Sequence, residues 1–227
     1  LMTQTISLTP RLAALYSEYL DASTDYDIIW DTCCDHGYLG QAILASNPRG
    51  QLVFVDQVVS ITKALSEHLQ SQSYVNYTIY TQDLAELKLA VDKTHLVIVA
   101  GIGGQLIVEL LTRLLANIKI SIDFIFCPST SVHSLRDYLS NNNFGLLNES
   151  IVTDNNRFYE IVFVRYKAAG RESVSLLGQM WDSNNNDHQQ YLKNLIRLYQ
   201  TRLKGGEAEA AQKILALYQQ CYGENFN

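Results

Sequence analysis

The sequence has little proline and little charge for its length, and it has no long hydrophobic run. Its 227 residues include only 3 Pro and 12 Gly, with 18% charged and 47% hydrophobic residues. This composition excludes collagen-like and intrinsically disordered chains. No stretch approaches the ~20 uninterrupted apolar residues of a membrane-spanning helix, so we expect no membrane association. The length suffices for one substantial core with an appendage.

Cysteine is also scarce, with 4 residues of which Cys33 and Cys34 are adjacent. This pattern does not predict a disulfide framework, and no secretory leader precedes it, so we expect a reduced, cytoplasmic setting. The two cysteines with Asp35 and His36 could hold a metal, but adjacent ligands on a tight turn rarely converge. No second Cys/His pair occurs at zinc spacing. We therefore expect no metal site, and we expect the other two cysteines to be small core residues.

The net charge of −6 is distributed unevenly along the chain. Residues 1–164 contain 9 Lys and Arg against 17 Asp and Glu, a net charge of −8. Residues 165–227 contain 8 against 6, a net charge of +2. The end of the chain is thus mildly basic on an acidic body. Because uneven surface charge is common, this asymmetry does not by itself identify a partner.

Short apolar runs alternate with helical periodicities along most of the chain. The runs predict strands at 26–30, 52–55, 76–80, 95–99, 124–127, 145–152 and 158–166. The periodicities predict helices at 8–20, from 38 to about 46, and at 58–71, 105–116 and 131–141. Continuous apolar strands indicate a parallel sheet covered on both faces, and a turn at Asn155-Asn156 makes the last two strands an antiparallel edge hairpin. We therefore expect a doubly wound α/β domain over residues 1–166.

Residues 167–227 have a different pattern, that of two amphipathic helices expected at 187–204 and 207–222. Gly205-Gly206 would form the turn of this helical hairpin, which we expect to be a short coiled coil. One stripe of the first helix carries Tyr191, Leu192, Leu195, Leu198, Tyr199 and Leu203. We expect this stripe to be the seam of the hairpin rather than a platform for stacking bases.

Four consecutive predicted strands are followed by polar or glycine residues, namely 31–37, Asp56, Asp83 and 101–104. In open α/β sheets, ligands bind beyond the carboxyl ends of the strands. Asp56 lies 19 residues after Gly37, a spacing that suits an acid hydrogen-bonded to ribose hydroxyls. The sequence therefore predicts an adenosine-containing ligand.

The first of these turns reads Asp-Thr-Cys-Cys-Asp-His-Gly from residue 31. A dinucleotide needs a glycine-rich turn that approaches its pyrophosphate at a helix N-terminus. This turn has one Gly, and its carboxylates Asp31 and Asp35 would repel phosphates by ~1 kcal/mol or more in a partly buried site. The sulfonium and ammonium groups of S-adenosylmethionine suit the two carboxylates better. The electrostatics thus favour a methyl donor over NAD.

Four segments carry recognisable motifs: Asp31-Thr-Cys-Cys-Asp-His-Gly-Tyr-Leu-Gly40, Val99-Ala-Gly-Ile-Gly-Gly104, Phe126-Cys-Pro-Ser129 and Phe158-Tyr-Glu-Ile161. Together they resemble the TrmK family of bacterial tRNA (adenine-N1)-methyltransferases, over about residues 8–164. That family also has a two-helix tail. The resemblance implies a class I Rossmann-like fold and methyl transfer from S-adenosylmethionine to N1 of adenine 22 in the tRNA D-arm. It implies tRNA as the partner, and we expect a monomer or a weak dimer formed through the hairpin.

The resemblance also implies roles for individual residues. The methionine end of the cofactor would be lined by Asp31, Asp35 and His36. Asp56 and Gln57 would hold the ribose, and Asp83 and Leu84 would flank the adenine. Cys33 and Gly37, in the same turn as Asp31, would also be cofactor-binding residues. The wall next to the methyl group would be Ala100, Gly101 and Gly103, and Arg11 would lie near the cofactor mouth. Pro128 and Ser129 would lie in the loop that meets the target base. The role of Asp35 is a separate hypothesis: because the methylated base is a cation, we expect the Asp35 carboxylate to act on the target base, near the adenine amine.

The chain departs from the family pattern at several positions. The family generally has Gly in place of Cys33, so the first turn must admit a side chain there. Cys127-Pro128-Ser129 replaces Gln-Pro-Asn, which removes two amide side chains from the loop expected to meet the base. Gly37 and Gly40 replace the more usual Ala and Pro.

Other interpretations of the same residues remain open. Asp31 could merely cap the following turn, His36 could be a satisfied buried histidine, and we expect Glu160 to be solvated on an edge strand. The same core could methylate a small molecule or a protein, or bind the cofactor without catalysis. A NAD-linked oxidoreductase is disfavoured by the missing pyrophosphate turn.

Overall fold

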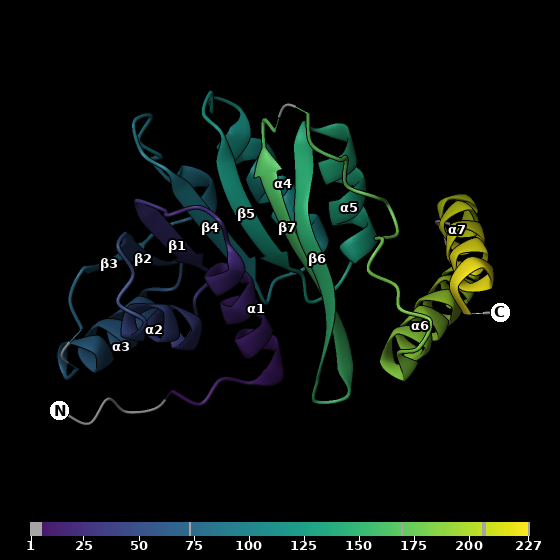
Figure 1. Ribbon diagram of the computed structural model, residues 1–227, viewed down its shortest axis with the longest axis horizontal. Helices are drawn as coiled ribbons and strands as arrows, with labels where there is room; N and C mark the ends of the chain where they lie inside the picture. Colours follow the sequence, from purple (N-terminus) through teal and green to yellow (C-terminus); the bar gives the residue numbers. More distant parts are fainter. Residues whose placement is uncertain (1–5, 73, 169, 206–207, 227) are drawn as a thin grey trace.

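Seven strands form one mixed sheet in the order β3-β2-β1-β4-β5-β7-β6 (Figure 1). The computed structural model describes residues 6–72, 74–168, 170–205 and 208–226. The strands are β1 Ile28–Thr32, β2 Gln51–Asp56, β3 Tyr77–Thr81, β4 His95–Ala100, β5 Ile122–Cys127, β6 Phe144–Asp154 and β7 Arg157–Tyr166. Strands β1 to β5 are parallel, and β7 and β6 continue the sheet in antiparallel pairs. The predicted doubly wound sheet with an antiparallel hairpin at one edge is confirmed.

Helices cover both faces of this sheet, as its alternating side chains require. Helices α1 Pro10–Asp21, α2 Tyr38–Ala45 and α3 Val59–Gln70 pack on one face, with strand residues such as Phe54 and Ile98. Helices α4 Gly104–Leu115 and α5 Val132–Asn141 pack on the other, with strand residues such as Val55 and Val99. A short 3₁₀ turn, η1 Leu84–Glu86, follows β3 and was not expected from the sequence. None of the described helices combines the length and apolarity needed to span a membrane.

Two local signals define element boundaries in the structure. Thr9 caps α1, its hydroxyl accepting a hydrogen bond from the backbone N–H of Leu12 at 3.4 Å, and Pro10 occupies the first helical position. Asn155 and Asn156 both have positive φ angles, 49° and 60°. These are the angles of a two-residue hairpin turn, which Asn tolerates better than most residues. The turn therefore fixes the register between β6 and β7.

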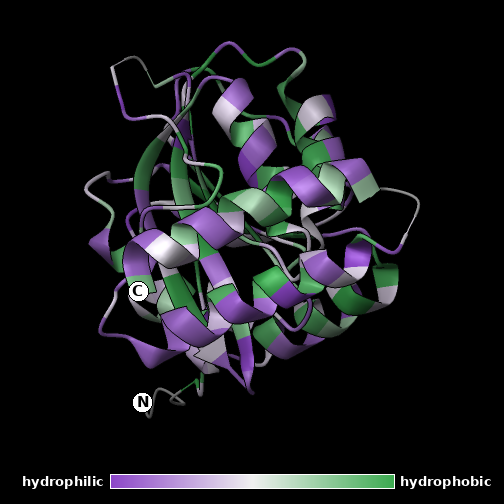
Figure 2. Cartoon of the chain, turned by 90° about the vertical axis from the view of Figure 1, so that its right-hand side faces the viewer, coloured by the Kyte–Doolittle hydropathy of each residue, from purple (hydrophilic) through white to green (hydrophobic). Residues whose placement is uncertain are grey.

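The tail consists of α6 Asn186–Arg202 and α7 Ala208–Phe226, and both helices carry hydrophilic and hydrophobic residues interspersed along their length (Figure 2). The two helices share a separate apolar cluster. Helix α7 runs four residues beyond its expected end, and Gly206 of the expected turn lies outside the described residues. The predicted seam is correct for most of its residues, but Leu198 is 44% exposed and is not part of it. The seam also contacts the body, because the rings of Tyr191 and Phe158 stack with centroids 5.4 Å apart.

A buried charge cluster attaches this tail to the sheet. Arg136 of α5 is fully buried, and its Nε donates to Glu160 at 2.6 Å while its Nη2 lies 2.8 Å from Glu149. The other carboxylate oxygen of Glu160 accepts a hydrogen bond from the Tyr191 hydroxyl at 2.9 Å. The expectation that Glu160 is solvated on an edge strand was wrong, because β7 lies between β5 and β6 and Glu160 is 2% exposed.

Arg136→Met should lower the free energy of unfolding by about 3 kcal/mol or more, because it leaves two carboxylates buried without their cation. Urea unfolding followed by circular dichroism measures this. The matched control is Arg197→Met on the exposed face of α6, which should change stability by less than about 0.5 kcal/mol. Equal midpoints for the two variants would contradict a structural role for the cluster.

Candidate functional site

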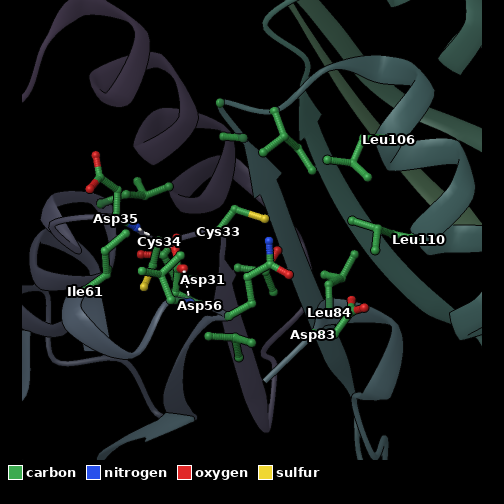
Figure 3. A pocket seen from close by; sticks show the side chains of 18 of the residues that line it. Asp31, Cys33, Cys34, Asp35, Asp56, Ile61, Asp83, Leu84, Leu106 and Leu110 are labelled. Carbon is green, nitrogen blue, oxygen red and sulfur yellow. Dashed lines mark hydrogen bonds between the residues drawn. The ribbon is translucent and has the colours of Figure 1, made fainter. Parts of the chain in front are cut away.

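A cavity of about 630 Å³ opens where β1, β2 and β4 end (Figure 3). Eleven of the fifteen predicted site residues line it: Arg11, Asp31, Cys33, Asp35, His36, Asp56, Gln57, Asp83, Leu84, Ala100 and Gly101. The other four lie beside the lining: Gly37, Gly103, Pro128 and Ser129. The parallel strand ends thus bring together residues from four separate turns, as expected for an open α/β sheet.

Asp31, at the end of β1, is held by the first turn of α2. Its Oδ2 accepts a hydrogen bond from the backbone N–H of Gly40 at 2.9 Å. A Cβ atom on residue 40 would lie 2.2 Å from the Phe54 ring and 2.8 Å from Asp31 Oδ2, so only Gly allows this approach. Asp31 therefore does cap the following helix, and its carboxylate also lines the cavity.

The turn between β1 and α2 passes repeatedly through the left-handed region. The φ angles are 55° at Cys33, 46° at Asp35 and 68° at Gly37. This conformation costs a residue with a Cβ atom ~1 kcal/mol or more, and Asp tolerates it better than Cys does. Gly37, the residue that precedes α2, adopts this left-handed conformation without a steric penalty because it has no Cβ atom. Cys33 adopts the same conformation with its side chain pointing into the cavity (Figure 3).

Burial favours the neutral form of several groups of this turn. Asp31 is 4% exposed, and burial raises the pKa of its carboxyl to about 7; the Gly40 N–H opposes this rise and the charge of Asp56 adds to it. Burial and the neighbouring carboxylates raise the pKa of the Cys33 thiol to about 12, and they raise the pKa of Cys34 as well. Neither thiol is a thiolate near neutral pH, so neither is a nucleophile here. A cation bound in the cavity would favour ionised Asp31.

Asp56 joins the ends of β1 and β2. Its Oδ1 accepts a hydrogen bond from the N–H of Val58 at 3.0 Å, and its Oδ2 accepts one from the N–H of Asp35 at 3.4 Å. The side chains of Asp35 and His36 are exposed, with 3.7 Å between Asp35 Oδ1 and His36 Nε2. His36 is thus not a buried histidine. Asp35 and Asp56 both line the cavity, Asp35 from the loop after β1 and Asp56 from the end of β2 (Figure 3).

The opposite wall comes from η1 and α4. Asp83 caps η1, its Oδ1 accepting from the N–H of Ala85 at 2.9 Å, and its Oδ2 pairs with Arg113 Nη1 at 2.9 Å. Leu106 and Leu110 of α4 supply an apolar surface, and Glu109 and Arg113 supply charge. None of these four α4 residues was predicted from the sequence. The sequence feature that could have predicted them is the helix directly after the glycine loop. Glu109 and Arg113 are four residues apart in this helix and therefore lie on one side of it.

The loop after β5 packs against the glycine loop after β4. The N–H of Ser129 donates to the carbonyl of Ile102 at 2.9 Å, and the N–H of Gly104 donates to the carbonyl of Thr130 at 2.8 Å. A Cβ atom on residue 104 would lie 2.3 Å from a backbone oxygen of this second loop. Pro128 is buried and Ser129 is exposed, so the predicted base loop adjoins the cavity without lining it.

Arg11 reaches the cavity from α1. Its Nη1 would be 4.0 Å from a Cβ atom on Gly101, and its guanidinium lies over the Tyr159 ring, 5.0 Å from the centroid. Two arginines, Arg11 and Arg113, line the cavity together with five carboxylates. The carboxylates are Asp31, Asp35, Asp56, Asp83 and Glu109. Arg113 is paired with Asp83, whereas Arg11 makes no ion pair with the described residues. The cavity therefore suits a ligand with cationic groups and one anionic group.

A family of proteins with a methyltransferase domain matches residues 8–162, well over half of the chain. The chain belongs to this family. A TrmK structure from M. capricolum, with S-adenosyl-homocysteine bound, superimposes with a TM-score of 0.75 at 18% identity, over 96% of this chain and 99% of that one. The B. subtilis M1A22 tRNA methyltransferase TrmK superimposes with a TM-score of 0.73 at 16% identity, over 98% and 100%. The resemblance to the TrmK fold that the motifs indicated is confirmed.

The curated relatives agree with this assignment. A Mycoplasma genitalium protein named "Putative tRNA methyltransferase MG248" is 24% identical over 188 residues, covering 78% of this chain and 82% of that protein. The shared region is longer than the methyltransferase domain alone.

Asp31→Asn should stabilise the ligand-free protein more at pH 8 than at pH 5. Asp31 binds its proton more tightly when folded, with a pKa of about 7 against an ordinary 3.8. Its contribution to the free energy of unfolding therefore falls as pH rises between these values. The gain in free energy of unfolding that Asn gives over Asp should be larger at pH 8 than at pH 5 by on the order of 2 kcal/mol. Thermal unfolding at both pH values measures this, with the exposed Asp35→Asn as control. A pH-independent difference would contradict the buried acid.

Proposed function

We propose that this chain transfers the methyl group of S-adenosylmethionine to N1 of an adenine in tRNA, of the position 22 type. The observation that carries the proposal is the acidic cavity at the strand ends of a methyltransferase domain, in a chain whose fold matches TrmK structures almost from end to end. The tRNA substrate comes from the names of those structures and of the curated relative.

The cavity residues fit the proposed cofactor in charge and in chemistry. S-adenosylmethionine supplies a methyl group on a sulfonium centre, together with an ammonium and a carboxylate. Asp31, Asp35 and His36 would face the methionine end, where a raised Asp31 pKa marks a buried acid without a cation. Arg11, which makes no ion pair with the described residues, would bind the carboxylate.

The other parts of the cavity would hold the nucleoside. Asp56 with Gln57 would accept hydrogen bonds from the ribose hydroxyls. Asp83 and Leu84 would flank the adenine, with Leu106 and Leu110 of α4 as its apolar cover. The methyl group would lie beside Ala100, Gly101 and Gly103, where small residues let a substrate approach closely.

Little proton chemistry is required of the protein. N1 of adenine has a lone pair at neutral pH, so no general base is needed before attack. The protein must mainly align the two reactants, which is worth ~7 kcal/mol or more. The product is a cation, so we propose that the exposed Asp35 carboxylate stabilises its developing charge. The loop with Pro128 and Ser129 would meet a base drawn out of its stack.

The tail would bind the RNA. We propose a catalytic domain at residues 1–166 and a tRNA-binding appendage at 167–227. The separate apolar cluster of the tail supports this division, and 7 Lys and Arg against 6 Asp and Glu give the appendage a net charge of +1 on an acidic body. We also propose a monomer or a weak dimer formed through the hairpin, which exposes Leu198. Unpaired cysteines and a tRNA substrate favour the cytoplasm.

Incubation with labelled S-adenosylmethionine and unmodified bacterial tRNA should yield 1-methyladenosine on nucleoside analysis. A tRNA in which adenine 22 is replaced should lose the label, which maps the position. Cofactor binding without label in any RNA would overturn the tRNA assignment, and a small-molecule or protein acceptor, or a non-catalytic role, would remain.

Asp35→Asn should lower kcat about tenfold to a hundredfold while the cofactor affinity changes less, because a charge-assisted contact to the product is lost. Asn keeps the left-handed backbone that residue 35 requires. Asp92→Asn, at an exposed position outside the cavity lining, is the matched control. Unchanged turnover in Asp35→Asn would remove residue 35 from catalysis.

A further inference from the structure

The paired strands β6 and β7 form a two-stranded arm, residues 148–161, most of which extends past the end of β5 (Figure 1). Successive side chains of a strand point to opposite faces. On one face, Val152 and Tyr159 form a cross-strand pair that packs with α1. On the other face, Ile151 and Phe158 pack with the tail. The arm thus lies between α1 and the tail.

Helix α1 is fixed to the arm at two levels. Glu18 is 8% exposed, and its carboxylate accepts hydrogen bonds from Asn148 Nδ2 at 2.9 Å and from Ser150 Oγ at 3.1 Å. At the N-terminal end of α1, Asp154 Oδ2 accepts a hydrogen bond from the backbone N–H of Arg11 at 3.4 Å. The backbone of Arg11 is therefore set by the arm rather than by the cavity.

The side chain of Arg11 is set by the same strand pair. Its guanidinium lies 5.0 Å from the centroid of the half-buried Tyr159 ring, within the range of a cation–π contact. Tyr159 does not belong to the cavity lining, whereas Arg11 does. The neighbours Phe158 and Glu160 point the other way, to the stacked Tyr191 ring and to Arg136. The Phe-Tyr-Glu motif therefore serves two faces of one strand.

We propose that Tyr159 is a positioning residue for the cofactor site: its ring holds the Arg11 guanidinium at the cavity mouth, where that cation binds the carboxylate of S-adenosylmethionine. This inference rests on the proposed function for the identity of the ligand. The physical reason is that an arginine side chain has many rotamers in water, and a ring below it restricts them before the ligand arrives.

Binding to S-adenosylhomocysteine and to 5′-methylthioadenosine, measured by calorimetry, tests the proposal. The second ligand has the same nucleoside but lacks the carboxylate. Tyr159→Leu should weaken binding of the first about threefold to tenfold and leave binding of the second unchanged. Tyr159→Phe keeps the ring and should bind both like wild type.

Two further variants separate positioning from folding. Arg11→Ala should weaken the binding of S-adenosylhomocysteine at least as much as Tyr159→Leu does. Adding Tyr159→Leu to Arg11→Ala should not weaken this binding further. Phe158→Leu, on the opposite face of the same strand, should lower the unfolding temperature without selective loss of the carboxylate ligand.

The outcomes distinguish this inference from the proposed function. No binding of S-adenosylhomocysteine by the wild type would overturn the proposed function and the role of Tyr159 with it. Normal binding by the wild type and equal affinities in Tyr159→Leu would overturn only the positioning role. Equal losses for both ligands, or additive losses with Arg11→Ala, would show that Tyr159 supports the fold in general.

Discussion

The parallel register of β1, β2 and β4 is the constraint on which the site depends. Thr32, Val55 and Val99 lie at one level across these strands. Asp56 and Ala100 therefore follow at the same edge of the sheet, one residue further along. A slip of one residue would move every side chain of a strand to the other face of the sheet and disrupt its packing against the helices on both faces. A cavity lined by the ends of separate strands thus follows from burial of the sheet on both faces.

A second constraint is the charge cluster around Arg136, which ties together α5, both strands of the arm and α6. Burying an arginine with two carboxylates is costly unless each hydrogen-bonding group finds a partner. Glu160 meets this condition by pairing with Arg136 and Tyr191. Such a cluster specifies one orientation of the tail on the body more strictly than apolar packing would.

The cavity also shows how function acts against stability. An acid buried at 4% exposure, with a pKa raised to about 7, is poorly stabilised when the ligand is absent. A cationic ligand would supply the missing charge, so the same group that weakens the free protein favours binding. The left-handed Cys33 adds backbone strain in the same turn.

Local patterns in the sequence determined the strands, most helix boundaries and the residues that follow each strand, because periodicity and turn chemistry act over a few neighbours. These patterns predicted the parallel sheet with its antiparallel edge hairpin, and together with the family resemblance they predicted eleven of the residues that line the cavity. Only the tertiary structure decided that Glu160 is buried, that Leu198 is exposed, and that α4 forms a wall. Likewise, Arg11 meets Tyr159 across 148 positions of sequence. No local pattern encodes such a contact, because it depends on how α1 and the arm pack in space.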